Sequence, residues 1–208
     1  MEAFNRKSHW ENIYQTKGQN EVSWYQERPV VSLDFIEKSK LPLDAKIIDI
    51  GGGDGFLVDC LLELGYSDIT VLDISETALI KAKQRLGNKA DLIKWIVTDI
   101  TSFEPEEQYD LWHDRAVFHF LIHEEDINIY TEIVDKTIKA NGILIVGTFS
   151  ENGPKKCSGI EIKQYSEEGL TQQFEHRFYK ENSLISNHTT PFDTIQNFTF
   201  CSFRKKNQ

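Results

Sequence analysis

The chain has 208 residues, of which 39% are hydrophobic and 27% are charged, a composition typical of one globular domain with a single sizeable core. Its formal net charge of −10 argues against a nucleic-acid partner, because phosphate binding requires clustered lysine and arginine. The sequence shows neither an apolar run long enough to cross a bilayer nor a signal peptide, so we expect a cytoplasmic protein without a membrane partner.

The three cysteines, Cys60, Cys157 and Cys201, are widely spaced and odd in number. They include no CxxC pair of the kind that ligates a metal ion, so we expect no metal site. A few isolated cysteines indicate free thiols in a reducing compartment, which agrees with a cytoplasmic location.

Residues 1–44 are predicted to be helical and to cap the rest of the chain. They are rich in aromatic side chains, and Pro29 is well placed in the first turn of a helix. From residue 45 to residue 149, short apolar runs alternate with runs of helical periodicity, which is typical of an α/β sheet. Five buried strands are predicted there: Lys46–Ile50, Ile69–Leu72, Leu92–Val97, Tyr109–Trp112 and Ile143–Phe149.

Amphipathic helices are predicted between these strands. Ser75 has the residue type of an N-cap, and the acidic Glu76 suits the first turn that follows it. Asn141 and Gly142 are expected to end the last of these helices in a left-handed cap before the fifth strand. The three predicted helices are Phe56–Leu64, Ser75–Leu86 and Asp126–Ala140.

Residues 150–208 begin with a loop that contains glycine and proline, Ser150–Ile160. A helix is predicted from about Ser166, followed by two β-rich runs, Phe174–Tyr179 and Thr194–Phe203. The second run alternates as FTFCSF, which is typical of an antiparallel strand with one buried face. Because no repeat or linker interrupts the chain, we predict a single domain over residues 1–208.

The segment Ile47–Gly55, IIDIGGGDG, follows a predicted strand and opens a predicted helix. Glycines at such a turn let the backbone approach a ligand, and the helix N-terminus faces that ligand. A phosphate-binding P-loop requires Gly-Lys-Ser/Thr, whereas Gly55 is followed by Phe and Leu. A dinucleotide loop requires GxGxxG, and its last glycine is replaced by Phe56 or Val58 in the two possible registers. A tight turn without a ligand is the structural alternative.

The remaining pattern, acidic-x-Gly-x-Gly-x-Gly, resembles the first motif of class I S-adenosylmethionine-dependent methyltransferases. Two further acids end the next two predicted strands, Asp73 in VLDIS and Asp99 in VTDI. A carboxylate at the position of Asp73 can accept hydrogen bonds from both ribose hydroxyls of a nucleoside. Three strand-end acids at one edge of the sheet favour a ligand over an empty turn, although Asp99 alone could be a surface acid.

This resemblance implies a Rossmann-like sheet of seven strands with helices on both faces, an antiparallel last strand and an N-terminal helical cap. Residues 45–149 would be the cofactor-binding core, and residues 150–208 would supply an acceptor-side loop and the C-terminal antiparallel strands. The implied cofactor is S-adenosyl-L-methionine, with Asp49 and Gly51 at its amino group, Asp73 at the ribose, and Ile74, Asp99 and Ile100 around the adenine. The rest of the implied cofactor set is Gly53 and Gly55 of the loop, together with Trp24 over the sulfonium.

The methyl acceptor must be inferred from other segments. The end of the fourth strand lacks the Asn/Asp-Pro-Pro-Tyr/Phe motif of enzymes that methylate nucleic-acid bases. Asp114-Arg115-Ala116 instead resembles Asp-Arg-Gly-Ala of thiopurine S-methyltransferases and Asp-Lys-Gly of some protein lysine methyltransferases. Trp10–Tyr14, Val22–Gln26 and Leu72–Leu79 also resemble the thiopurine and thiol methyltransferase group. Ser23 and Tyr25 depart from that group, which has proline and aspartate at these two positions.

A thiol must be deprotonated before it attacks, and nearby cations lower its pKa. The candidate cations are His113, Arg115, His119 and His123, in the fourth strand and the segment after it. His113, Arg115 and His119, together with Asp114 between the first two, are the candidate catalytic residues. Each has a structural alternative. Arg115 could pair with Asp114, and His119 and His123 could lie on one exposed helix face.

Trp10, Tyr25 and Cys157 are the candidate acceptor-binding residues. The long loop that contains Cys157 follows the fifth strand, at the edge of the sheet where the cofactor is expected. Lys155 and Lys156 would lower the pKa of the Cys157 thiol if they stay close to it, although a cysteine that merely lines the wall is the alternative.

The sequence therefore predicts methyl transfer to a small molecule, with a thiol, sulfide or related chalcogen as the favoured acceptor. A protein lysine methyltransferase is the first alternative, in which Asp114, Glu124 and Glu125 would hold the lysine ammonium. A module that binds S-adenosylmethionine without catalysis is the second. The oligomeric state cannot be inferred from these patterns.

Overall fold

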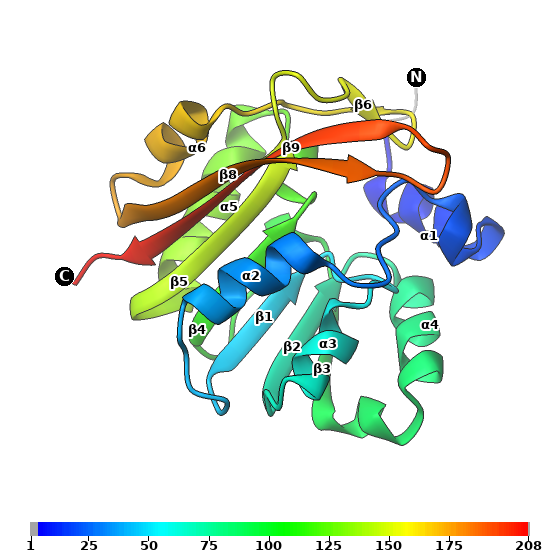
Figure 1. Cartoon of the computed structure of the whole chain (residues 1–208), viewed down its shortest axis with the longest axis horizontal. Helices are drawn as coiled ribbons and strands as arrows, with labels where there is room; N and C mark the ends of the chain where they lie inside the picture. Colours follow the sequence, from blue (N-terminus) through cyan, green and yellow to red (C-terminus); the bar gives the residue numbers. More distant parts are fainter. Residues whose placement is uncertain (1–3, 208) are drawn as a thin grey trace.

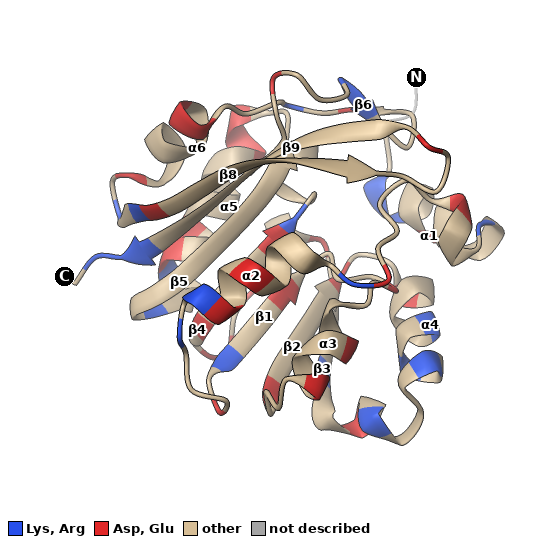
Figure 2. Ribbon diagram, in the orientation of Figure 1, with Lys and Arg blue, Asp and Glu red and all other residues tan. Residues whose placement is uncertain are grey.

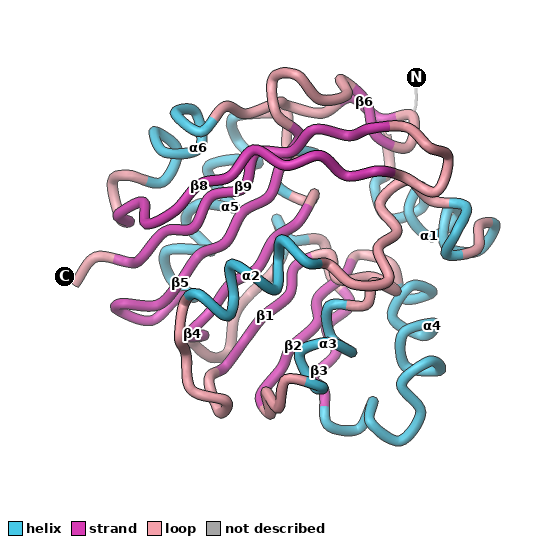
Figure 3. The backbone as a smooth tube through the Cα atoms, viewed as in Figure 1, coloured by secondary structure: helices cyan, strands magenta, loops and turns pink. Residues whose placement is uncertain are grey.

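A computed structural model describes residues 4–207 of the chain. Its centre is a seven-stranded sheet in the order β3-β2-β1-β4-β5-β9-β8 (Figures 1 and 3). The first five strands along the chain are parallel to one another, and β9 runs antiparallel to both of its neighbours. The strands are β1 (Lys46–Ile50), β2 (Asp68–Asp73), β3 (Ile93–Val97), β4 (Tyr109–Arg115), β5 (Ile138–Phe149), β8 (Phe178–Thr189) and β9 (Ile195–Lys205). The predicted Rossmann-like sheet with its antiparallel last strand is confirmed.

Helices cover both faces of this sheet. In Figure 1, α2 and α3 lie in front of the sheet, and α5 lies behind it. The α-helices are α1 (Arg6–Thr16), α2 (Val30–Lys38), α3 (Leu57–Glu63), α4 (Glu76–Leu86), α5 (Glu124–Thr137) and α6 (Glu167–Phe174). Four 3₁₀ helices, η1 (Gln19–Glu21), η2 (Gly87–Leu92), η3 (Ile100–Ser102) and η4 (Phe118–Phe120), and a small hairpin of β6 (Lys156–Cys157) and β7 (Ile160–Glu161) complete the described elements.

Two hydrophobic cores form because alternate residues of each strand point to opposite faces of the sheet. On one face, Ile47 of β1 and Leu111 of β4 pack with residues of α2 and α3. On the other face, Ile48 of β1 and Trp112 of β4 pack with residues of α5 and α6. This alternation also decides where the polar residues at the strand ends point.

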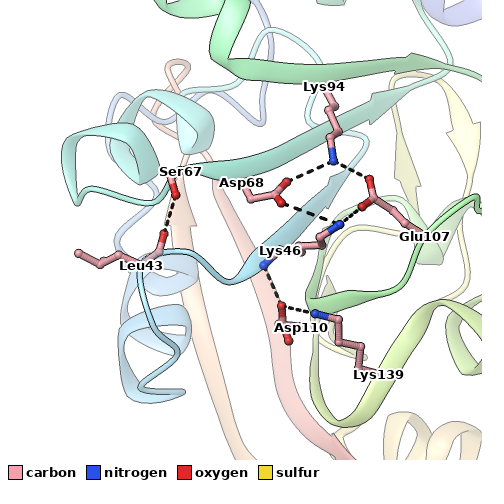
Figure 4. Close-up of polar contacts among 8 residues, drawn as sticks. All are labelled: Leu43, Lys46, Ser67, Asp68, Lys94, Glu107, Asp110 and Lys139. Carbon is pink, nitrogen blue, oxygen red and sulfur yellow. Dashed lines mark hydrogen bonds and ion pairs between the residues drawn. The ribbon is translucent and has the colours of Figure 1, made fainter.

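A network of charges crosses the amino ends of the strands, opposite the edge where the glycine loop lies (Figure 4). Glu107 accepts a hydrogen bond from Lys94 at 2.7 Å and forms an ion pair with Lys46. Asp110 accepts hydrogen bonds from the main-chain nitrogen of Lys46 at 2.8 Å and from Lys139 at 2.7 Å. These contacts tie neighbouring strands together at the edge away from the candidate site.

The side chains that cap two helices agree with the sequence interpretation. Ser75 is the N-cap of α4, and its hydroxyl accepts a hydrogen bond from the main-chain nitrogen of Ala78 at 3.1 Å. Ser166 caps α6 in the same way, accepting from the main-chain nitrogen of Gly169 at 3.0 Å. Pro29 is the N-cap of α2, one residue before the first helical turn.

Three details of the prediction are wrong. Helix α5 ends at Thr137, because Ile138 is fully buried and pairs with Tyr109 as the first residue of β5. Asn141 does adopt the left-handed conformation, with φ of 61°, but it lies inside β5, where the register with β4 shifts. The run Phe174–Tyr179 begins in helix α6, and β8 starts only at Phe178.

The burial of the last two strands also differs from the expectation. β9 is buried on both faces rather than one, because it is an interior strand of a sheet that is covered by helices on both sides. β8 is the edge strand, and most of its side chains are exposed. One lysine lies beside acidic residues at the C-terminal end of α2 and another at the start of β8, as Figure 2 shows. No helix within residues 4–207 is long and apolar enough to span a membrane.

Candidate active site

A pocket lies at the carboxyl ends of β1, β2 and β4, beneath α1 and the segment that follows it. Parallel α/β sheets bind ligands at this edge. Most of the residues proposed from the sequence line it: Trp10, Trp24, Tyr25, Asp49, Gly51, Gly55, Asp73, Ile74, Asp99, Ile100, His113, Arg115 and Cys157. Three of the proposed residues, Gly53, Asp114 and His119, are not among its lining residues.

The glycine loop leaves space that a side chain would fill. Gly51 has φ of 65°, and a Cβ atom there would lie 2.1 Å from Cγ2 of Val117. Gly53 has φ of 52°, and a Cβ atom there would lie 2.5 Å from the hydroxyl of Tyr14. Because both positions need a left-handed backbone and allow no Cβ, the loop can bring its main chain close to a ligand. This cradle fits a small cofactor.

Asp73 lies at the end of β2 and is buried. One of its carboxylate oxygens, Oδ1, accepts a hydrogen bond from the main-chain nitrogen of Ser75 at 2.8 Å. Burial raises the pKa of Asp73 to about 7, and hydrogen bonds from the main chain of Ser75 and Gly53 oppose this rise. A buried carboxylate of this kind gains by accepting hydrogen bonds from ligand hydroxyls.

Asp99 lines the pocket and also caps η3. Its Oδ1 atom accepts hydrogen bonds from the main-chain nitrogen of Thr101 at 2.9 Å and from the Thr101 hydroxyl at 2.8 Å. Arg6 of α1, which the sequence interpretation did not single out, pairs with Asp99 at 3.5 Å and with Asp126 at 2.6 Å. Asp99 is therefore placed between the cap helix and the pocket.

His113 links two other pocket residues. Its Nδ1 atom lies 2.7 Å from Oδ1 of Asp49, and its Nε2 atom lies 2.8 Å from the hydroxyl of Ser32. Asp49 and His113 are directly paired in register across β1 and β4, so their side chains leave the sheet on the same face. Ser32 comes from α2, and no feature of the sequence pointed to it.

Asp114 points to the opposite face from His113 and Arg115, contrary to the expectation that it is catalytic. It is fully buried, and it accepts hydrogen bonds from the hydroxyl of Tyr130 at 2.6 Å and from the main-chain nitrogen of Val117 at 2.9 Å. Burial raises its pKa to about 6, although these hydrogen bonds favour the charged form. Asp114 therefore supports the turn after β4.

His119 also does not line the pocket, contrary to the expectation that it is catalytic. It is fully buried in η4, and Nδ1 accepts a hydrogen bond from the main-chain nitrogen of Phe149 at 3.2 Å. Burial lowers its pKa to about 3, and the nearby charge of Arg115 acts in the same direction. The alternative of an exposed helix face shared with His123 is wrong as well, because only His123, the N-cap of α5, is exposed.

Arg115 does not pair with Asp114, because the two side chains leave β4 on opposite faces. Its Nη1 atom donates a hydrogen bond to the main-chain oxygen of Trp24 at 3.2 Å, and the guanidinium lies 4.9 Å from the ring centre of Phe198. Nη2 is buried and has no hydrogen-bond partner within residues 4–207. Burial lowers the pKa of Arg115 to about 10, so it remains a cation at neutral pH.

Cys157 lines the pocket as the wall cysteine that the sequence interpretation allowed, and the condition for a lowered thiol pKa, two close lysines, is not met. Burial raises the pKa of Cys157 to about 11, although a hydrogen bond with Ser158 and the charge of Arg115 oppose this. Lys155 and Lys156 are exposed, and Lys156 lies 3.9 Å from Glu161 in an ion pair across the small hairpin. The cysteine is thus a neutral part of the wall.

Aromatic side chains form the cover of the pocket. Trp10 packs edge-on against Trp24 at 5.7 Å between ring centres and against Phe120 at 5.1 Å. Tyr14 packs against Trp24 at 6.2 Å, and Tyr25 packs against Phe56 at 5.9 Å. The sequence motif Trp10–Tyr14 already contained Tyr14, but its contact with the glycine loop was not foreseen.

Comparisons with known proteins agree with this geometry. The methyltransferase-domain family matches residues 48–144. The mouse eEF1A lysine and N-terminal methyltransferase is 26% identical over 146 residues, which are 69% of this chain and 20% of that protein. Malonyl-[acyl-carrier protein] O-methyltransferase 2 of Ilyobacter polytropus is 29% identical over 119 residues, which are 57% of this chain and 44% of that protein. The chain thus spans less than half the length of either of these relatives.

The N-methyltransferase NodS from Bradyrhizobium japonicum WM9, solved with S-adenosyl-L-homocysteine, has the same fold, with a TM-score of 0.71 and 15% sequence identity. The superposition covers 98% of this chain and all of that one. The sheet order and the glycine cradle agree with the match of residues 48–144 to the methyltransferase-domain family, and the fold is that of S-adenosylmethionine-dependent methyltransferases.

Proposed function

We propose that this protein transfers the methyl group of S-adenosylmethionine to a small molecule, and that the favoured acceptor is a thiol, sulfide or related chalcogen. The observation that carries this proposal is Arg115, whose buried Nη2 atom lacks a partner within residues 4–207 at the edge of an aromatic pocket. A buried cation with an unused donor favours an acceptor that is anionic when it reacts, because the unpaired donor is costly without one.

The residues of this chain that would hold the cofactor are those of the glycine cradle and the strand-end acids. Asp49 would accept hydrogen bonds from its amino group, Asp73 would bind the ribose, and Asp99 with Ile100 would contact the adenine. When bound, S-adenosylmethionine supplies a methyl group on a positively charged sulfur that is already an activated leaving group. The protein then has to align the acceptor, exclude water and set the protonation state of the acceptor.

The aromatic cover suits the exclusion of water and the binding of the cofactor. Trp10 and Trp24 belong to the segments that close the pocket, and their rings would exclude water from it. Aromatic faces also attract a positively charged sulfur. A soft, polarisable acceptor that is stripped of water in such a pocket becomes a stronger nucleophile.

A protein lysine acceptor is the second candidate, because the mouse relative bears that activity in its name. The acids proposed from the sequence to hold a lysine ammonium, Asp114, Glu124 and Glu125, do not support a lysine acceptor. Asp114 faces the other side of the sheet, and Glu124 pairs on the surface with Lys163 at 2.9 Å. Glu125 is exposed in the first turn of α5. The cation of Arg115 lines the pocket and would repel a lysine ammonium.

A panel of acceptors tests the proposal. The protein is incubated with S-adenosylmethionine labelled in its methyl group and with thiols, sulfide, selenide, carboxylic acids, amines or a cell lysate. We expect label on thiols or selenide. Label found only on protein bands would favour the lysine alternative, and label on no acceptor, combined with tight binding of S-adenosylhomocysteine, would favour a binding module without catalysis.

A further inference from the structure

Three buried polar side chains from three different elements form a continuous hydrogen-bonded chain beside the pocket. They are Ser32 of α2, His113 of β4 and Asp49 of β1, with exposed fractions of 1%, 2% and 5%. The Ser32 hydroxyl lies 2.8 Å from Nε2 of His113, and Nδ1 lies 2.7 Å from Oδ1 of Asp49. All three residues line the pocket.

The direction of these hydrogen bonds follows from the groups available. Asp49 is an acceptor when ionised, so Nδ1 of His113 carries the hydrogen that it donates to Asp49. Within residues 4–207, the Ser32 hydroxyl has no hydrogen-bond partner other than His113. A buried hydroxyl must donate to avoid a desolvation cost, so Ser32 donates to the lone pair of Nε2. This assignment places the hydrogen of His113 on Nδ1 and a lone pair on Nε2.

Other charged and titratable groups surround His113. Asp114 and Arg115 follow it on β4, and Asp114 interacts with it electrostatically. Cys157 of β6 and Asp49 of β1 both interact with Arg115. The direct contact of His113 with Asp49 is a buried hydrogen bond of 2.7 Å between Nδ1 and Oδ1.

We infer that Ser32 and His113 form a relay that removes the proton of the methyl acceptor, with Asp49 orienting His113 and stabilising the charge that it gains. This inference rests on the proposed function, since a thiol carries a proton that must leave. A bond forms between the acceptor sulfur and the methyl carbon, and the bond between that carbon and the cofactor sulfur breaks. The electron pair of the broken bond stays on the cofactor sulfur. The thiol proton passes to the Ser32 oxygen as the Ser32 proton passes to Nε2 of His113.

The relay also separates thiols from the other anionic acceptors that Arg115 could bind. A carboxylic acid is already ionised at neutral pH and needs no base. An alkyl thiol is mostly protonated at that pH, so a positioned base accelerates its reaction. The relay and Arg115 would thus act on the same acceptor, one by accepting its proton and the other by stabilising the negative charge.

Two thiols of different acidity test the relay. An alkyl thiol needs the base, whereas an aromatic thiol that is ionised at the assay pH does not. We expect Ser32→Ala and His113→Gln to slow single-turnover methylation of the alkyl thiol by about 100-fold. The rate with the aromatic thiol should change less than about threefold. The rate of the variants with the alkyl thiol should rise with pH up to the pKa of the free thiol, because only the ionised thiol reacts without a base. Equal slowing of both thiols would mean that the residues only support the structure, and would overturn the relay.

A control variant and an NMR measurement distinguish the relay from effects on folding and do not require the acceptor to be known. Ser39→Ala, at the C-terminal end of α2, is the control for Ser32→Ala and should leave both rates unchanged. The ¹⁵N NMR shifts of His113 in the wild-type protein with S-adenosylhomocysteine should show hydrogen on Nδ1 and a lone pair on Nε2. Hydrogen on Nε2 of neutral His113 would overturn the relay whatever the acceptor is. If the wild-type protein methylates no thiol or selenide, the proposed function is wrong, and methylation of carboxylates alone would overturn both proposals.

Discussion

Nη1 of Arg115 donates a hydrogen bond to the main-chain oxygen of Trp24 at 3.2 Å. This contact joins the end of β4 to the segment that covers the pocket. His188 of β8 holds the same segment from another side, because its Nε2 atom donates to the main-chain oxygen of Ser23 at 2.8 Å. The hydrogen bond from Arg115 therefore fixes the covering segment relative to β4. Replacing Arg115 tests whether its charge acts on the methyl acceptor.

Replacing Arg115 with glutamine should impair methyl transfer more than cofactor binding. Glutamine is polar but shorter than arginine, and it lacks the charge that stabilises an anionic acceptor. We expect the single-turnover rate with a thiol to fall by about 100-fold, while the Kd of S-adenosylhomocysteine changes less than about threefold. Rapid-quench assays and calorimetry measure the two quantities.

The control for this variant is Arg177→Gln, because the Arg177 side chain is 48% exposed and pairs with Asp135 away from the pocket. It should leave both quantities unchanged. An Arg115→Gln variant that methylates thiols at the wild-type rate would contradict the role assigned to the cation.

Cofactor binding should depend on pH through Asp73. Burial raises its pKa to about 7, so the empty protein holds a proton on Asp73 below that pH. Ribose hydroxyls donate hydrogen bonds to the ionised carboxylate, so affinity should fall as the pH drops from 8 to 6, by roughly tenfold. Calorimetry with S-adenosylhomocysteine over this range measures the effect.

Asp73→Asn should bind the same ligand about 10- to 100-fold more weakly at pH 8 and should lose the pH dependence. Asp44→Asn changes an exposed carboxylate before β1 and should behave as the wild type. The raised pKa has a second consequence for the empty protein. Its free energy of unfolding should decrease as pH rises from about 4 to 7, because the folded state retains a proton that the unfolded state releases.

Glu11 of α1 stabilises the start of α4. Its carboxylate accepts hydrogen bonds from the main-chain nitrogen of Glu76 at 2.7 Å and from the hydroxyl of Ser75 at 3.1 Å. Burial alone would raise the pKa of Glu11, but hydrogen bonds from Thr77, Glu76 and Ser75 lower it overall. We expect Glu11→Ala to reduce the free energy of unfolding by about 1 kcal/mol, as measured by urea denaturation.

Because the pKa of Glu11 is lowered on folding, its contribution is complete above the pKa of an unfolded glutamate and is lost as pH falls through the lower, folded value. The difference between the wild type and Glu11→Ala should therefore shrink below about pH 4. Glu37→Ala, an exposed residue of α2, is the control and should have little effect at any pH. A constant difference across this range would mean that packing, rather than charge, explains the role of Glu11.

The cofactor side of the site could be predicted from the sequence because it depends on local patterns. Asp49 and Asp73 are among the last two residues of apolar strands, and parallel strands bring their carboxyl ends to one edge of the sheet. The glycine loop follows one predicted strand and precedes one predicted helix, and both can be predicted from the sequence. These residues reach the pocket through main-chain geometry that short segments already determine.

The acceptor side was harder to predict because its contacts join distant segments. Ser32 and His113 are 81 residues apart, and no local pattern indicates that α2 packs over the end of β4. The pKa of Cys157 depends on burial in the folded chain, which the two adjacent lysines in the sequence do not reveal. Alternation along β4 was available in the sequence, and it would have separated Asp114 from His113 and Arg115.

Because alternate residues of β4 face opposite sides of the sheet, we expect different effects from substitutions of the neighbours His113 and Asp114. Asp114 accepts hydrogen bonds from Tyr130 at 2.6 Å and from the main-chain nitrogen of Val117 at 2.9 Å, on the side of the sheet away from the pocket. Asp114→Asn should lower the free energy of unfolding by about 2 kcal/mol, because the amide group cannot accept all of these hydrogen bonds. Its single-turnover rate should stay within about threefold of wild type at a temperature where the variant is folded. Thermal denaturation and rapid-quench assays on Asp114→Asn and His113→Gln together should show loss of stability in the first and loss of rate in the second. If Asp114→Asn is slow but fully stable, Asp114 takes part in catalysis, as the sequence predicted. The end of β4 would then have to rearrange when the pocket is occupied.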